Sequence, residues 1–136
     1  MRTMALDIGD KRIGVAVSDE TNTISTGVSV IARETLKRDI EKIKNYVDAY
    51  KVGKIIVGLP LTLKGGKSIQ TEKVEGFISR LKQSVNISIV PFDERLSTAQ
   101  SEKLLISADV SRKKRKTVID KLAAQIILQA YLDMVS

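Results

Sequence analysis

Residues 54–59 (KIIVGL) constrain the fold of this chain more than any other segment. The run is short and almost continuously apolar, and β-branched residues fill its centre. Such a run is typical of a strand that other elements cover on both faces. We therefore expect residues 54–59 to form a strand at the centre of a sheet.

Further strands are predicted on both sides of this run along the chain. Residues 4–9 (MALDIG) and 12–18 (RIGVAVS) are apolar segments joined by a tight turn, and residues 24–31 (ISTGVSVI) continue a meander. Residues 86–92 supply one more strand near the middle of the chain.

Helices are predicted between and after these strands. From Thr35, apolar residues recur at three- and four-residue steps, which indicates a helix with one buried stripe. Ser68 can cap a second helix, and Ser97 with Gln100 resembles a capping box before a helix that carries residues 104–106. The last helix is expected over residues 117–134.

The order of these elements predicts an α/β protein. A meander implies antiparallel strands, whereas each strand-helix-strand unit implies a right-handed parallel crossover. We expect a mixed five-stranded sheet, antiparallel in its meander and parallel at its crossovers, flanked by helices. A length of 136 residues suits one domain, residues 1–136.

Composition removes several classes of chemistry. The chain has no Cys and no His, which excludes thiol nucleophiles, Cys-ligated zinc and imidazole general bases. The readiest hydrolytic chemistry left is a set of carboxylates that hold a hard cation. A net charge of +7 favours an acidic partner such as nucleic acid, although a merely soluble basic surface is the alternative.

No stretch approaches the roughly 20 apolar residues that span a bilayer, so we expect a cytoplasmic protein without a membrane partner.

Acidic residues stand out at three places in the chain. Asp7 interrupts an apolar strand, where a charge is costly unless it is paired or bound to a cation. Asp93 and Glu94 follow the strand of residues 86–92, and strand ends in α/β sheets present ligand groups. Asp120 falls at the edge of the buried stripe of the last helix, within its first turns. Each acid also has an ordinary structural explanation. Asp7 could be paired with a neighbouring Lys or a turn amide, Asp93 and Glu94 could belong to an ordinary turn, and Asp120 could favour the helix dipole.

Four blocks of the sequence, in order, resemble the motifs of the YqgF/RuvX family. They are residues 5–9 with 12–19, residues 56–60 (IVGLP), residues 93–98 (DERLST), and residues 120–124 with 127–129. The resemblance covers nearly the whole chain. It implies an RNase H-like fold and a nuclease, since members are described as pre-16S rRNA nucleases or Holliday junction resolvases.

The resemblance also implies a site. The acidic triad of the family corresponds to Asp7, Glu94 and Asp120, which would be both the catalytic residues and the ligands of Mg²⁺ or Mn²⁺. Asp93 remains a possible substitute for Glu94. The loop after residues 54–59 reads LTLKGGKS where relatives commonly have Asn-Met-Asp-Gly, so the substrate contacts of this loop are open.

Basic residues indicate where an acidic polymer would bind. Five consecutive cations precede the predicted last helix, and such groups bind phosphates without reading sequence. A solvated charged loop is the alternative. The predicted substrate-binding residues are Lys11, Arg12, Arg95, Arg112, Lys113, Lys114, Arg115 and Lys116.

Other functions are open from sequence alone. Processing of the 5′ end of pre-16S rRNA is the first expectation, and resolution of four-way DNA, which would need a dimer, is the second. A binding module without catalysis is a further alternative. An actin-like ATPase would need two such domains, and a Walker A loop would need Gly at the position of Leu61. The sequence does not separate a monomer from a homodimer.

Overall fold

A computed structural model gives the arrangement of the chain. It describes the backbone of residues 1–97 and 112–136, and the side chains of residues 1–97 and 122–136. The strands are β1 (Arg2–Ile8), β2 (Arg12–Ser18), β3 (Ser25–Ala32), β4 (Val52–Leu59) and β5 (Ser88–Asp93). The helices are α1 (Leu36–Tyr50), α2 (Ile69–Ser84), the 3-10 turn η1 (Glu94–Leu96) and α4 (Arg112–Val135).

The strands form the predicted mixed sheet of five strands, in the order β3-β2-β1-β4-β5. β1 pairs antiparallel with β2, and β2 with β3, whereas β1 pairs parallel with β4, and β4 with β5. One expectation needs correction, because the middle strand is β1 and β4 is its neighbour. β4 is nevertheless covered on both faces, since Ile55, Ile56 and Val57 are fully buried.

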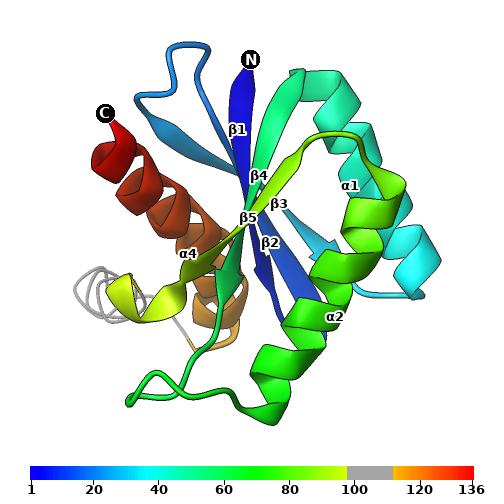
Figure 1. Cartoon of the computed structure of the whole chain (residues 1–136), viewed down its shortest axis with the longest axis vertical. Helices are drawn as coiled ribbons and strands as arrows, with labels where there is room; N and C mark the ends of the chain where they lie inside the picture. The colour runs from blue at the N-terminus through cyan, green and yellow to red at the C-terminus, as the bar shows by residue number, and fades with distance from the viewer. Residues whose placement is uncertain (98–111) are drawn as a thin grey trace.

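Helices cover the two faces of the sheet separately (Figure 1). One core cluster joins residues of β1, β2 and β4, including Met4, Leu6 and Ile55, to the apolar stripes of α1 and α2. A second cluster packs Ala5 and other small or apolar residues of the sheet against α4. The alternation of Met4, Ala5 and Leu6 between the clusters follows from the two-residue period of a strand.

The predicted helix starts hold for α1 and α2. The side chain of Thr35 caps α1 by accepting from the Arg38 amide, and Ser68 begins α2 with a capping box that includes Thr71. The helix predicted after Ser97 lies outside the described residues, and Ser97 itself follows η1.

The last helix begins earlier than predicted. α4 starts at Arg112, so the five cations of residues 112–116 lie in its first turns and not in a loop before it. Cations at a helix start oppose the helix dipole. Lys and Arg have good intrinsic helix propensity, which suits the observed boundary. None of the described helices is long and apolar enough to cross a membrane.

Candidate carboxylate site

Parallel pairing brings the carboxyl ends of β1, β4 and β5 to one edge of the sheet. Leu6 of β1 is level with Val57 of β4, and Gly58 is level with Phe92 of β5. Ala5, Ile56 and Phe92 all belong to the core on the α4 side. The residues two positions further along these segments share that side. They are Asp7, Gly58 and Glu94.

Gly58 separates the two acids, because β4 lies between β1 and β5. A Cβ atom at Gly58 would lie 2.8 Å from the Glu94 Oε1 atom and 2.8 Å from the Ile127 Cδ1 atom. Such approaches are closer than van der Waals contact allows. The missing side chain therefore provides the space that the Glu94 carboxyl occupies between the sheet and α4.

The carboxyl groups of Asp7 and Glu94 lie within hydrogen-bonding distance of each other. Burial, the hydrogen bond to Asp7, and the negative charges of Asp7 and Asp93 raise the pKa of Glu94 to about 9. Two acids held together in this way cannot both be ionised without a compensating charge. A cation that contacts both carboxyls would supply such a charge.

Asp93 has a different environment. Its carboxylate accepts hydrogen bonds from the backbone amide of Arg95 at 3.0 Å and from the Arg95 guanidinium, with Nε at 2.9 Å from Oδ2. The hydrogen bond from the Arg95 side chain holds the pKa of Asp93 below its ordinary value. Of the two adjacent acids, Glu94 is the one that contacts Asp7.

The turn after Asp7 is held from the opposite face of the sheet. The guanidinium of Arg33 donates to the carbonyl oxygen of Gly9 at 3.0 Å and pairs with the fully buried Asp39 at 3.1 Å. The backbone amide of Arg33 also donates to the Lys11 carbonyl oxygen at 2.9 Å. The segment that presents Lys11 and begins β2 at Arg12 is therefore fixed near Asp7.

Asp120 belongs to α4, and its side chain lies outside the described residues. The helix begins eight residues earlier, at Arg112, so Asp120 is past the first turn, where the dipole effect is concentrated. Position 120 precedes Ala124 by four residues and Ile127 by seven, and helical periodicity puts these positions on one face. The side chains of residues 112–116 are also outside the described part.

Two of the three predicted metal ligands, Asp7 and Glu94, have described side chains. Among the described side chains, no group of three or more Asp, Glu, His or Cys could hold a metal ion. The pair of Asp7 and Glu94 fits a hard cation, because two carboxyls that contact each other at a half-buried site offer oxygen ligands and excess negative charge. The third predicted ligand, Asp120, stays a prediction.

Comparison with known proteins identifies the family. A family model described as "RuvX: Holliday junction resolvase" matches residues 1–134. The chain belongs to the RuvX family. A relative in Thermoanaerobacter pseudethanolicus, named "Putative pre-16S rRNA nuclease", is 52% identical over 134 residues, which cover 98% of this chain and 96% of the relative. A relative of the same name in Clostridium tetani is 46% identical and covers 99% of this chain and 98% of its own.

Solved structures support the fold of this RuvX-family chain. Thermus thermophilus RuvC in complex with a Holliday junction substrate has a TM-score of 0.61 at 12% identity, covering 99% of this chain and 96% of that chain. The fowlpox virus Holliday junction resolvase has a TM-score of 0.58 at 17% identity, covering 98% and 99%. At such identities the likeness concerns the fold, and it confirms the predicted RNase H-like class.

Sequence reasoning missed two parts of the site. Gly58 interrupts an otherwise apolar, β-branched strand, and a glycine there is a known sign of close approach by another group. Asp39 was not singled out either, since an acid in the first turn of a helix is ordinary. Its complete burial appears only in the structure.

Proposed function

We propose that this protein is a metal-dependent nuclease that hydrolyses phosphodiester bonds in structured nucleic acid, with the 5′ end of pre-16S rRNA as its substrate. The observation that carries the proposal is the contact between the Asp7 and Glu94 carboxyls at the ends of β1 and β5. Membership of the RuvX family and the names of its close relatives support the same activity. A role in ribosome biogenesis would place the protein in the cytoplasm.

Asp7, Glu94 and Asp120 are proposed as the ligands of Mg²⁺ or Mn²⁺. A bound cation of this kind supplies Lewis acidity toward the phosphate and lowers the pKa of a coordinated water. The residues of this chain contribute the negative charge that binds the cation, and Gly58 leaves room for the Glu94 side chain to meet Asp7. Position 120 on the packed face of α4 is compatible with a third ligand.

Nucleic acid is proposed to bind along the edge that carries these acids. Lys11 and Arg12 lie four and five residues after Asp7, at the turn between β1 and β2, and the hydrogen bonds of this turn hold their backbone. The cations of residues 112–116 begin α4, the helix that carries Asp120. Contacts of this type neutralise phosphates and give affinity without base specificity. The chain would act as a monomer or a homodimer.

Holliday junction resolution is the second candidate, favoured by the family description and by the likeness to the resolvase fold. It would require a dimer with two sites. A phosphate-binding Walker loop is disfavoured by the geometry of the loop after β4. There the amides of Gly65 and Gly66 donate to the Thr62 carbonyl oxygen and hydroxyl, at 2.8 and 2.9 Å.

Cleavage of two substrates by one preparation tests the proposal. A pre-16S rRNA fragment with its 5′ extension and a synthetic four-way DNA junction are each incubated with Mg²⁺, with Mn²⁺ and with EDTA. We expect metal-dependent cleavage of the RNA at its 5′ extension. Symmetric cleavage of the junction alone would favour the second candidate, and cleavage of neither would leave a binding module without catalysis.

A further inference from the structure

The loop between β4 and α2 is organised by its own hydrogen bonds. Leu61 and Lys67 form an antiparallel bridge at its base. Thr62 accepts from the amides of two glycines within the loop, and Gly65 adopts a positive φ of 85°, which glycine tolerates well. We call residues 61–67 the 61–67 loop. Its conformation is set before any ligand arrives.

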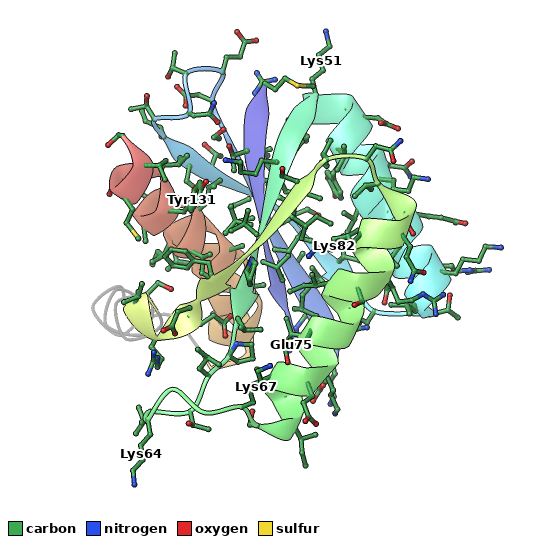
Figure 2. The ribbon with its side chains drawn as sticks, viewed as in Figure 1. Lys51, Lys64, Lys67, Glu75, Lys82 and Tyr131 are labelled. Carbon is green, nitrogen blue, oxygen red and sulfur yellow. The ribbon has the colours of Figure 1, made fainter. Side chains whose placement is uncertain are left out.

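This ordered loop displays an apolar side chain to solvent. Leu63 is 95% exposed, the highest fraction among the exposed large hydrophobic residues of the described chain. Lys64 follows it and points away from the body of the molecule at the outer end of the loop (Figure 2). Within the described residues Lys64 forms no ion pair, whereas Lys67 pairs with Glu75 at 2.9 Å.

Arg95 connects this loop to the carboxylate site. Its Nη1 atom donates to the Leu63 carbonyl oxygen at 3.3 Å, and its other guanidinium nitrogens bind Asp93. A Cβ atom at Gly65 would lie 3.4 Å from Nη1, so the guanidinium lies against the loop backbone. Asp93 and Arg95, which form an ion pair, are the sequence neighbours of Glu94 on either side. The 61–67 loop, η1 and the start of α4 lie at the same end of the molecule (Figure 1).

We propose that the 61–67 loop is a second nucleic-acid contact, in which Leu63 packs against an unpaired base or sugar beside the carboxylate site, Lys64 binds a phosphate, and Arg95 is a positioning residue. The inference rests on the proposed nuclease function. An exposed leucine next to a lysine suits a nucleic-acid strand, which offers apolar base faces next to charged phosphates. The net charge of +7 favours this partner over a basic protein surface.

The aromatic residues of the chain all lie outside the 61–67 loop, so none of them can make the proposed base contact of Leu63. Tyr46 and Tyr50 stack on each other along α1, and Phe92 contacts Tyr131 edge to face beneath α4. Phe77 is buried in α2. With none of these in the 61–67 loop, Leu63 is the large apolar group that this loop offers to a strand at the carboxylate site.

Binding measured as a function of salt separates the two side chains. The probe is a fluorescent RNA stem with a single-stranded 5′ extension, and a labelled four-way DNA junction serves as the second arm, both in EDTA to prevent cleavage. Leu63→Ser should weaken binding about five- to tenfold with an unchanged salt slope, since an apolar contact releases no counterion. Lys64→Ala should reduce the log–log slope by about 0.7 to 0.9. If the variants weaken binding to only one of the two probes, that probe shows whether the loop contacts RNA or DNA.

Matched variants keep this test decisive. Ile24→Ser removes an apolar side chain that is 61% exposed in the turn between β2 and β3, at the other end of the molecule, and should bind like wild type. Leu63→Met keeps the apolar contact and should also bind like wild type. Wild-type affinity of Leu63→Ser on both probes would overturn the loop contact. Since these measurements need no cleavage, they can fail or succeed independently of the nuclease proposal.

Arg95 has its own readout. Lysine keeps the charge but lacks the planar fork that binds Asp93 and Leu63 together. If Arg95 positions the loop, Arg95→Lys should weaken binding as Leu63→Ser does, with an unchanged salt slope, and the double variant should lose little more. If Arg95 binds a phosphate itself, Arg95→Lys should keep affinity and Arg95→Ala should lower the slope, which would overturn the positioning role.

Discussion

Gly58 shows at the scale of one residue how a missing side chain can define a site. Asp7 and Glu94 come from segments on either side of β4, and they meet only because the residue between them occupies no space above the sheet. The packing of Ile127 against the same position closes the gap from the α4 side. A Cβ atom at Gly58 must displace the side chains of Glu94 and Ile127.

Gly58→Ala should therefore impair catalysis with little loss of fold. Its Cβ atom would lie 2.8 Å from the Glu94 Oε1 atom, and a shift of about 1 Å in a reacting group can cost roughly a hundredfold in rate. Steady-state cleavage rates with Mg²⁺ measure the loss. Gly76→Ala is the matched control, because nothing lies within 4 Å of its Cβ position in α2. It should cleave normally and gain about 0.5–1 kcal/mol in stability. Equal activity of the two variants would contradict the role of Gly58.

The Asp7–Glu94 pair predicts a pH dependence. The pKa of Glu94 is raised from an ordinary 4.5 to about 9 in the folded, metal-free protein. The folded state therefore keeps a proton that the unfolded chain releases, and this contribution to stability is lost as pH rises from about 4.5 through about 9. Melting temperatures in EDTA should fall across this window relative to Glu94→Gln, and added Mg²⁺ should restore more stability at higher pH. If the melting temperatures of the wild type and of Glu94→Gln changed with pH in the same way, the raised pKa of Glu94 beside Asp7 would be contradicted.

At the scale of elements, α1 supports the β1–β2 turn from the far side of the sheet. Asp39 in its first turn is fully buried and accepts from the Glu34 amide at 2.9 Å and from Arg33, which in turn holds the carbonyl oxygen of Gly9. Removing the Asp39 carboxylate would leave the Arg33 guanidinium without its buried ion-pair partner. The helix thus fixes the turn that follows Asp7.

Asp39→Ala should destabilise the protein by roughly 2–4 kcal/mol, because it leaves Arg33 and the Glu34 amide without their acceptor. Urea unfolding measures the change. The comparison is Glu34→Gln, which removes only exposed ion pairs with Arg38 and Lys42 and should change stability by less than about 0.5 kcal/mol. A similar small effect for Asp39→Ala would show that the buried pair does not anchor the turn.

The elements also show what sequence could and could not predict. Hydrophobic periods predicted the strands, α1 and α2, and the capping residue Ser68 predicted where α2 begins, because these signals are local. The middle position of β1 depends on pairing across long sequence separations, which no local pattern encodes. Family motifs supplied Asp7 and Glu94, whereas their contact depends on strand register and on the space at Gly58.

At the scale of the whole molecule, charge should guide the strand to the acidic site. The cations of residues 112–116 lie at the start of α4 and carry much of the excess of 23 Lys and Arg over 16 Asp and Glu. Neutralising this run should weaken nucleic-acid binding and reduce the log–log salt slope by about 0.7 to 0.9 for each lost phosphate contact. An unchanged slope would mean that the run is solvated and does not touch the strand.

The most direct test of the account compares cleavage and binding in Asp7→Asn and Asp19→Asn. Asp7→Asn keeps size but removes charge that would hold the cation, so we expect binding to persist and cleavage to disappear. Asp19 lies in the β2–β3 turn, where hydrogen bonds from Thr21 and the turn amides lower its pKa to about 2. Its variant should cleave normally. Wild-type cleavage by Asp7→Asn would contradict the carboxylate site, and loss of cleavage in both folded variants would mean that the site lies elsewhere.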